Sequence, residues 1–547
     1  MKELYIDIME KALSAYTDER IIEYINEVKK NGLTEHGFPR LAANIGILIA
    51  HGRCLEKIPI FIELMDISCE QMIKVKAANN FSVREVCMCI AELEKSKAVD
   101  KEKLCQWKAQ ITSFEPWKLY NSIPETPTSY VHNWSIFSSL SELLRHNILG
   151  TEAEDFIDWN LASQFNNIDE FGMYKDPNNP IMYDFVGRML LGALVHFGYR
   201  GKYAQKINEI LDKVDEITLK LQSVSGEISF GGRSNQMTLC EPLFAAYCEM
   251  AAVRHKKKGD LYLAGQFKAA AELAVKHTFL CFEKFPFSHV KNRYGADYGI
   301  GCENYAYFNK YMITIASNIY MAYAMADDSI VPTEVPANKG GYLLKTSQDF
   351  HKVIMSNGGY TAQFDTNADF AYDANGLGRV QKADCSSIIC LSVPFPSENA
   401  NYKLPKPNKR GMSICSFSGD DFGSHGNLKL LDFSESEEKV TAKFQNTLNN
   451  GEVIIENYSL TSNGLDIEIS GNANAGIMIP VLDFDGQKNS KVIMEENSIS
   501  IEYEGSVCKN IFDGVIEGDF EIYHNRNGRY RLYKMYGKNL HIEIEKL

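Results

Sequence analysis

Residues 312–341, MITIASNIYMAYAMADDSIVPTEVPANKGG, contain the point at which the chain changes its periodicity. In the first part of this stretch, residues 312–325, apolar side chains recur at intervals of about three and four residues, which is typical of an amphipathic helix. The last part, residues 330–341, holds two Pro and two Gly in twelve positions. We expect this composition to stop helices and to form a linker between two domains.

The part of the chain before the linker repeats the helical period many times. Examples are residues 41–49, 140–148 and 269–279, and we count roughly ten to twelve such segments. Short turns rich in Gly, Pro or Asn join them, and helices joined in this way form antiparallel hairpins. Such hairpins build a solenoid or close into a ring. Because no repeat of about 34 or 40 residues is visible, a regular repeat array is disfavoured.

After the linker, the apolar period becomes two. The alternating stretches are residues 453–458, 465–469, 499–503 and 540–544. Turn sequences stand between such stretches, at 449–451, 462–464, 485–486 and 527–528. Many short strands with one polar face predict an antiparallel β-sandwich. The sequence therefore predicts an α+β multidomain protein, with helices over residues 1–329, a linker over 330–341 and a β-sandwich over 342–547.

The composition is that of a globular protein. Of 547 residues, 45% are hydrophobic and 23% are charged, which excludes a disordered chain. The net charge of −14 argues against nucleic acid as a partner, because nucleic-acid binding needs a basic surface. A negative net charge is still compatible with a cleft that is locally basic. The 13 cysteines form no CxxC pair, which favours free thiols in a reducing compartment.

The N-terminal residues predict neither export nor a membrane anchor. Residues 1–16 carry acidic side chains within their apolar pattern, whereas a signal peptide needs about 7–15 uncharged apolar residues. No apolar run approaches the roughly 18 residues of a membrane span. We therefore expect a cytoplasmic protein with no membrane partner, and the sequence says nothing firm about its oligomeric state.

Five stretches collect polar and aromatic residues at helix starts and in loops: 35–40, 130–134, 175–188, 225–236 and 291–311. Each has a plain alternative, such as a helix start, a loop or a buried aromatic residue. In the first stretch, His36 stands ahead of a helix. In the second, Trp134 follows His132 and Asn133, and an indole ring beside hydrogen-bonding groups suits a sugar ring.

The third and fourth stretches combine cations with tyrosine and amides. Tyr183 and Arg188 fall on the opening turns of a helix, where a tyrosine near cations can act as a base. Arg233 and Asn235 stand close to a helix start, which favours an anion. Ser234 between them could instead be a simple N-cap.

The fifth stretch is unusually rich in hydroxyl groups. Five Tyr, three Asn and one Arg occur within 21 residues, among them Arg293 and Tyr305. A buried core has little use for so many hydroxyls, because each needs a partner. A carbohydrate groove provides such partners.

The polar stretches contain few acids, and this favours one of two kinds of glycan chemistry. A glycosidase needs two carboxyl groups beside the scissile bond. A uronate lyase instead neutralises the substrate carboxylate with Asn, Arg or His, and moves protons with Tyr or His. No Ser-His-Asp order, GxSxG elbow, phosphate-binding loop or HExxH motif occurs in the chain.

These features together resemble a known family. Helical hairpins followed by a β-sandwich are similar to polysaccharide lyases of the heparinase II/III and chondroitin AC lyase type. The likeness is closer still to heparinase-like bacterial proteins and rhamnosyl-glucuronate lyases. It is carried by residues 35–53 (EHGFPRLAANIGILIAHGR), 132–150 (HNWSIFSSLSELLRHNILG), 226–241 (GEISFGGRSNQMTLCE), 303–322 (ENYAYFNKYMITIASNIYMA) and 365–382 (DTNADFAYDANGLGRVQK). The resemblance implies that the helical half is an incomplete (α/α) toroid and the catalytic domain.

The resemblance also implies roles for single residues. An Asn-Trp segment lines the groove of such lyases, which matches Asn133 and Trp134. A glycine turn before a helix carries a catalytic His in the family. The comparable stretch here ends in Arg233-Ser234-Asn235-Gln236 and has no His, so the base would be His132 or Tyr183.

Two further segments follow from the same resemblance. A later Arg that binds substrate would match Arg293. Residues 376–379 of the sandwich, Gly-Leu-Gly-Arg, either approach the groove from the second domain or form a turn packed on the linker.

We therefore predict a lyase that cleaves a uronic-acid-containing glycan by β-elimination and leaves a 4,5-unsaturated uronate. In this hypothesis the carboxylate is neutralised by Arg233 and Asn235, with Asn133 as a further candidate. Tyr183 or His132 takes the C5 proton, and one of them protonates the leaving oxygen. The remaining substrate-binding residues are His36, Trp134, Arg188, Arg293 and Tyr305.

The expected partner is an acidic glycan, and short oligosaccharides fit best because the net charge of −14 repels a polyanion. No cofactor is implied, and a metal in the sandwich is left open. One alternative is a glycoside hydrolase on the same toroid, whose acids would come from Asp184, Glu241, Asp297 and Glu303. The other alternative is a carbohydrate-binding protein without activity.

Overall fold

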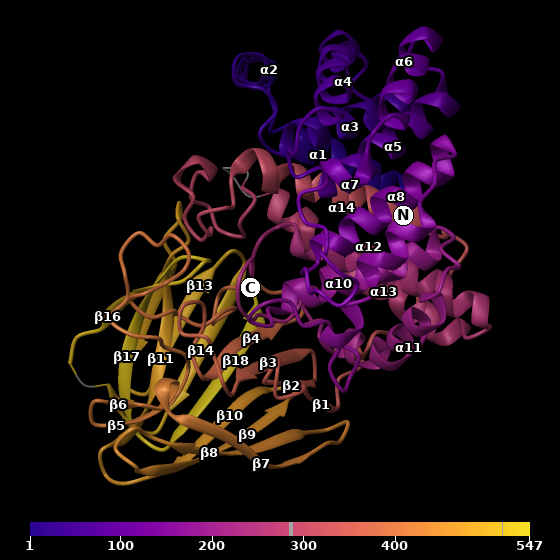
Figure 1. Ribbon diagram of the computed structural model, residues 1–547. Helices are drawn as coiled ribbons and strands as arrows, with labels where there is room; N and C mark the ends of the chain where they lie inside the picture. Colours follow the sequence, from indigo (N-terminus) through magenta and orange to yellow (C-terminus); the bar gives the residue numbers. More distant parts are fainter. Residues whose placement is uncertain (284–287, 517) are drawn as a thin grey trace.

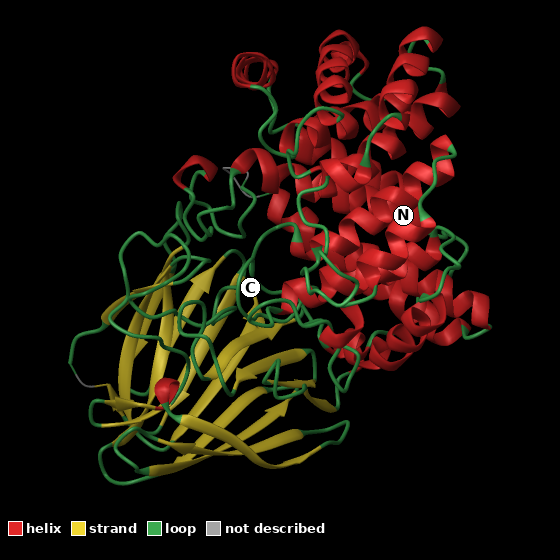
Figure 2. Ribbon diagram, viewed as in Figure 1, coloured by secondary structure: helices red, strands yellow, loops and turns green. Residues whose placement is uncertain are grey.

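The computed structural model describes residues 1–283, 288–516 and 518–547. Helices occupy one side of the molecule and sheets the other (Figure 1; Figure 2). The predicted fold class is confirmed: a helical toroid precedes antiparallel sheets that form a β-sandwich. Each side has its own hydrophobic core, and the helical core also takes in Leu344 and Ile354 from the first two strands.

The described residues form fifteen α-helices. They are α1 (Lys2–Leu13), α2 (Asp18–Asn31), α3 (Gly37–Ala50), α4 (Ile58–Met72), α5 (Asn79–Ser96), α6 (Lys101–Thr112), α7 (Pro116–Leu119), α8 (Trp134–Leu149), α9 (Glu154–Leu161), α10 (Ile181–His196), α11 (Ala204–Lys220), α12 (Cys240–Lys258), α13 (Leu261–Phe282), α14 (Phe308–Met325) and α15 (Pro336–Lys339).

The helices turn back on themselves. Helix α1 packs against α14, so the first helix meets the last long one. Helices α3 and α10 are apolar on nearly all sides and almost wholly buried, which is typical of helices inside a protein. Helix α11 buries one stripe spaced at three and four residues, and it therefore lies on the outside. Inner and outer helices of this kind form the toroid.

The sandwich contains eighteen strands in the described residues. They are β1 (Tyr342–Lys345), β2 (Lys352–Asn357), β3 (Tyr360–Asp365), β4 (Gly376–Lys382), β5 (Ser416–Ser418), β6 (Asp421–Phe422), β7 (Asn427–Ser434), β8 (Val440–Thr447), β9 (Val453–Thr461), β10 (Gly464–Ser470), β11 (Ala475–Phe484), β12 (Lys491–Glu495), β13 (Ser498–Tyr503), β14 (Ser506–Phe512), β15 (Val515–Ile516), β16 (Glu521–His524), β17 (Arg529–Tyr536) and β18 (Asn539–Lys546).

These strands pair antiparallel in three sheets. One sheet has the order β1-β2-β3-β4, and a second has the order β12-β13-β14-β18-β10-β9-β8-β7. The third has the order β15-β17-β11-β5-β6, with β16 paired to β17. Strand β9 alternates buried and partly buried residues along most of its length, which is the period-two pattern that its sequence predicts.

The four-stranded sheet connects the two sides of the molecule. It lies on the side of the sandwich that faces the helices (Figure 1). Gln363 on β3 donates to the carbonyl of Phe230 at 3.0 Å and accepts from its N–H at 3.2 Å. Arg379 on β4 is fully buried and donates to the carbonyl of Ile228 at 2.8 Å and to Glu227 Oε2 at 3.2 Å. Residues 376–379 therefore contact the segment 227–230.

Two local details differ from what the sequence predicts. The expectation that residues 330–341 contain no helix is wrong at α15, which is a single turn. Pro336 occupies the start of this turn, where proline loses no hydrogen bond. Ser234 is not an N-cap, because the following helix begins only at Cys240. Within the described ranges, none of the helices is both long and apolar enough to span a bilayer.

Replacing Arg379 by Ala is expected to lower the free energy of unfolding by roughly 3–5 kcal/mol, because the buried carboxylate of Glu227 loses a partner. Lys491→Ala is the control. It removes one side of an exposed ion pair with Glu502 and should cost no more than about 1 kcal/mol. Urea unfolding followed by circular dichroism measures both variants. Equal midpoint shifts for the two variants would contradict the stated role of Arg379.

Candidate functional site

A cavity of about 750 Å³ opens in the helical half of the molecule. Its lining comes from α3, α5, α8, α10, α12 and α14, and from the loops that precede several of these helices. Seven of the ten residues that the sequence singled out line this cleft: His36, His132, Asn133, Trp134, Tyr183, Arg233 and Tyr305. Residues from five separate stretches of the chain therefore share one cavity, as a binding site requires.

Hydroxyl groups gather around Ser234 in the cleft. The Ser234 Oγ lies 3.3 Å from the Tyr183 hydroxyl and 3.0 Å from the Tyr305 hydroxyl. Burial, followed by the neighbouring Tyr183, raises the pKa of Tyr305 and that of Tyr311 above the usual range. Tyr305 and Tyr311 therefore keep their protons at neutral pH and can donate them in hydrogen bonds.

Arg233 lies over the face of Tyr183, with its guanidinium carbon 4.3 Å from the ring centroid. It is ion-paired with the buried Asp176 and donates to the carbonyl of Pro177. The same carboxylate accepts from Asn133 Nδ2 at 2.9 Å. Burial opposes the charge of Arg233, but Tyr183 and Asp176 outweigh it and raise its pKa. Asp176 therefore ties Asn133 and Arg233 together beside Tyr183.

The backbone of the loop that carries Arg233 is held by two carboxylates. Ser234 has a φ of 57°, a conformation that non-glycine residues rarely adopt. Its N–H donates to Glu303 Oε1 at 2.6 Å, and Arg526 of the sandwich lies 2.6 Å from the same oxygen. The N–H of Gly232 donates to Asp373 Oδ2 at 2.7 Å, and burial raises the pKa of Asp373 to about 7.

His132 and Trp134 stand at the entrance to α8. Their rings meet edge to face with centroids 5.7 Å apart, and Trp134 meets Phe81 in the same way at 5.1 Å. Burial lowers the pKa of His132, whereas the smaller effects of Asp176 and Arg233 act in opposite directions. The imidazole of His132 is therefore neutral at pH 7.

Three cations of the cleft were not among the ten predicted site residues: Arg40 and Lys310, which fall within the stretches 35–40 and 291–311, and Arg84, which lies outside all five stretches. Arg84 is 1% exposed on α5, where it stands between Val83 and Glu85. The apolar run that follows at residues 86–91 indicates a buried helix and was the signal that could have identified Arg84, because an arginine is rarely buried without a reason. With Arg233, the described lining holds four basic side chains and a single carboxylate, Glu35.

The other three predicted residues lie outside the cleft. Arg188 is fully buried on α10, where it pairs with Asp184 at 2.5 Å and donates to Thr218 at 2.6 Å. Asn235 is 5% exposed, and its Oδ1 accepts from Gln236 at 3.1 Å. Both side chains are buried, and neither belongs to the described lining of the cavity.

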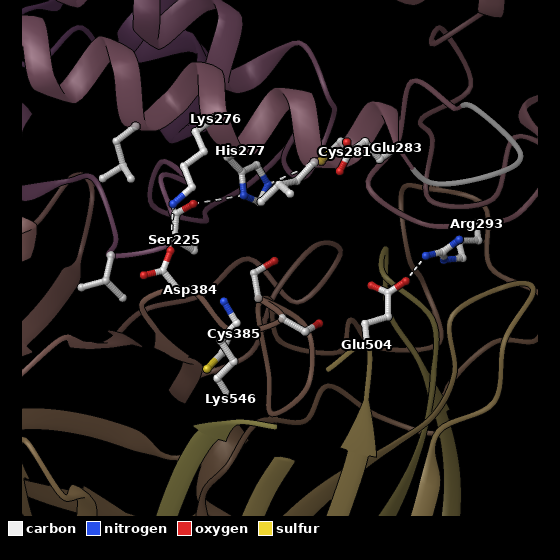
Figure 3. Close-up of a pocket in the computed structure, with 15 residues that line it drawn as sticks. Ser225, Lys276, His277, Cys281, Glu283, Arg293, Asp384, Cys385, Glu504 and Lys546 are labelled. Carbon is white, nitrogen blue, oxygen red and sulfur yellow. Dashed lines mark hydrogen bonds and ion pairs between the residues drawn. The ribbon is translucent and has the colours of Figure 1, made fainter. Parts of the chain in front are cut away.

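Arg293 lines a second cavity, of about 540 Å³, between the helices and the sandwich. It is ion-paired there with Glu504 (Figure 3), and its Nε lies 2.7 Å from Asp485. On the other side of this cavity, Lys276 of α13 reaches Asp384 at 2.8 Å (Figure 3). Since these opposite charges pair across the two halves of the molecule, Arg293 takes part in a contact between them and not in the cleft.

The four acids considered for hydrolysis also lie outside the described lining of the cleft. Asp184 pairs with Arg188, Glu241 pairs with Lys291 at 2.8 Å, and Asp297 is exposed near Arg20. Glu303 holds the backbone of Ser234. Among the residues that the structure describes, no group of three or more His, Cys, Asp and Glu side chains could hold a metal ion.

Comparison with known proteins gives a structural likeness and no sequence match. No model of a protein family matches the chain, and no curated protein matches it. The crystal structure of heparinase III is similar with a TM-score of 0.50 and 11% identity, over 92% of this chain and 76% of that one. The chondroitin lyase ODV-E66, a baculovirus envelope protein, gives 0.46 and 8%, over 93% and 76%.

A glycoside hydrolase is also among the similar structures. Ara127N-Se, a GH127 β-L-arabinofuranosidase from Geobacillus stearothermophilus T6, gives a TM-score of 0.37 and 10% identity, over 100% of this chain and 98% of that one. At such low identities the likeness concerns the fold alone. The chain has the heparinase-like polysaccharide lyase fold, in which a helical toroid precedes an antiparallel β-sandwich.

Proposed function

We propose that this protein is a lyase that cleaves a uronic-acid-containing oligosaccharide by β-elimination. One observation carries the proposal: the described lining of the cleft combines four basic side chains and a tyrosine cluster with one carboxylate, Glu35. Hydrolysis of a glycosidic bond usually needs a pair of carboxyl groups, one on each side of that bond. The four cations outnumber the three carboxylates that they pair with, Asp176, Glu85 and Glu35, so the cleft keeps a positive charge that suits an acidic sugar.

In this proposal Arg233 binds the carboxylate of the uronate and neutralises its charge, which makes the C5 proton more acidic. Tyr183 takes that proton through its phenolic oxygen. The electron pair of the broken C–H bond forms the C4–C5 double bond, and the bond between C4 and the glycosidic oxygen breaks. The departing oxygen receives a proton from Tyr183 or from Tyr305, which keeps its proton at neutral pH.

The position of Arg233 over the ring favours Tyr183 as the base, because a nearby cation stabilises a developing phenolate. His132 is the second candidate, since its neutral imidazole can accept a proton. Trp134 and the half-exposed Tyr305 offer faces for sugar rings. Asn133 acts through Asp176 in this scheme, and Asn235 has no direct contact with the sugar.

The proposal is tested by incubating the protein with glycosaminoglycan, rhamnose-glucuronate and alginate fragments. Elimination raises the ultraviolet absorbance of the unsaturated product. An increase in reducing ends without that absorbance would indicate hydrolysis. Binding without either change would indicate a carbohydrate-binding protein.

Tyr183→Phe is expected to lower kcat by roughly 10²–10⁴-fold with little change in KM, because it removes the proton acceptor and leaves the ring in place. The matched control is Tyr298→Phe, which alters a tyrosine that is 68% exposed and does not line the cleft. Initial rates of absorbance increase measure both. If the rate of Tyr183→Phe stays within a factor of a few of the wild-type rate, Tyr183 is not the base.

The pH profile is expected to show a limb on the acid side that belongs to His132. The pKa of this partly buried imidazole lies below its usual value of about 6.5, so the ring gains its proton only as the pH falls through that lowered pKa. With Tyr183 as the base, protonation of His132 acts on the rate by adding a positive charge that repels the nearby Arg233 guanidinium and weakens its hold on the substrate carboxylate. We expect kcat/KM to fall on acidification and His132→Gln to lose this limb. An unchanged limb in His132→Gln would assign it to other groups.

Glu303→Gln tests whether the loop must be held for activity. The variant weakens the bond to the Ser234 N–H and leaves Arg526 without its buried counter-ion. Displacing Ser234 shifts the hydroxyl cluster, so kcat should fall by up to about 10²-fold while KM changes less. Glu303→Asp keeps the charge and should recover part of the rate. Equal losses in the two variants would argue against the role of the carboxylate.

A further inference from the structure

A second group of cations lies in the cleft on α3, α5 and α14, apart from the Tyr183 and Arg233 pair. Arg40 on α3 donates through Nε to Glu85 at 2.9 Å and through Nη1 to Thr314 at 2.9 Å. Arg84 on α5 has a weaker set of partners. Its one described ion pair is with the same Glu85 oxygen, at 3.4 Å from Nη2.

The carboxylate of Glu85 has little capacity left for Arg84. One of its oxygens accepts from Arg40, and the other accepts from Asn44 at 3.0 Å and from Ser317 at 2.7 Å. The Nε and Nη1 groups of Arg84 have no hydrogen-bond partner, although the side chain is 1% exposed. Burying charged donors in this state is costly unless an acceptor reaches them.

The surroundings of Arg84 make the local charge positive. The guanidinium lies 5.0 Å from the ring centroid of Phe137, which is also part of the cleft lining. Burial lowers the pKa of Arg84 to about 10, which still leaves it charged at neutral pH. The pKa of His36 is lowered by burial and then by Arg40 and Lys310, so the imidazole is neutral at pH 7 and has no negative charge to offset the guanidinium groups. Two guanidinium groups therefore share one buried carboxylate.

We propose that Arg84 binds a second oxyanion of the substrate, a sulfate ester or a further carboxylate on a sugar next to the uronate. This inference rests on the proposed function for the identity of the ligand, but the anion site itself does not. The buried donors of Arg84 lack an acceptor, and an oxyanion brings both the charge and the lone pairs that the site is missing. The substrate is then a glycan with at least two acidic groups.

Inorganic sulfate and acetate are the probes for this site. Calorimetric titrations compare them with chloride at constant ionic strength, so that general screening is the same throughout. We expect wild type to bind one of the two, and Arg84→Met to bind it at least tenfold more weakly, the scale of a lost charged hydrogen bond. Preference for sulfate indicates a sulfate ester, and preference for acetate indicates a carboxylate.

Arg20→Met is the matched control. Arg20 also lies over a phenylalanine ring, with its guanidinium carbon 4.0 Å from the centroid of Phe308, but it does not line the cleft. This variant should bind the probe like wild type. Arg84→Lys keeps a positive charge with different donors and should bind with intermediate strength.

Thermal unfolding gives an independent readout. If Arg84 serves a ligand, Arg84→Met should unfold within a few degrees of wild type, because two of the three nitrogens that it removes have no partner and Glu85 keeps Arg40, Asn44 and Ser317. Equal anion binding by wild type and Arg84→Met would overturn the proposal. Absence of sulfate and acetate binding by wild type, or a large loss of thermal stability in Arg84→Met with Arg84→Lys binding normally, would also overturn it.

The two proposals fail in different ways. If no glycan is cleaved but sulfate binding depends on Arg84, the anion site stands and the lyase function falls. If glycans are cleaved, Arg84→Met should raise KM by about tenfold for a substrate with the second acidic group and leave KM unchanged for one without it. Equal KM changes for both substrates would contradict the inference alone.

Discussion

The buried carboxylate of Glu227 sets the place where the helices and the sandwich meet. A carboxylate without access to water must find cations, and Glu227 has Arg379 at 3.2 Å and Lys291 at 3.4 Å. Burial alone would raise its pKa, but Lys291, His277 and Arg379 together hold the pKa below its ordinary value. Because Arg379 comes from β4, this ion-pair group fixes the sandwich against residues 227–230, and the loop that carries Arg233 starts directly after them.

Much of the fold and part of the cleft could be predicted from the sequence, because both depend on local patterns. Apolar residues recur every three to four positions in a helix with one buried side and every two positions in a strand with one buried side. Either spacing can be recognised within about ten residues of sequence. His36, Trp134, Tyr183 and Tyr305 stood out because large polar or aromatic side chains at helix starts need a reason beyond packing. In the structure these residues, which come from separate parts of the chain, line the same cavity.

The remaining features depend on contacts between distant residues, which no local pattern records. Arg188 was expected to bind a sugar. In the structure it forms a buried ion pair with Asp184, one helical turn earlier. Arg293 pairs with Glu504, more than two hundred residues away. Arg84 was missed because the shortage of acceptors around it appears only once Arg40, Asn44 and Ser317 are seen to occupy Glu85.

The bond between the Ser234 N–H and Glu303 has a consequence for the order in which the protein matures. Glu303 takes its counter-charge from Arg526, which is synthesised long after the loop that it helps to hold. During translation the helical half can collapse around its own core while the loop still lacks this support. The cleft would then acquire its working shape last, as the sandwich docks, so that an unfinished chain holds the groove but not the arrangement of hydroxyls inside it.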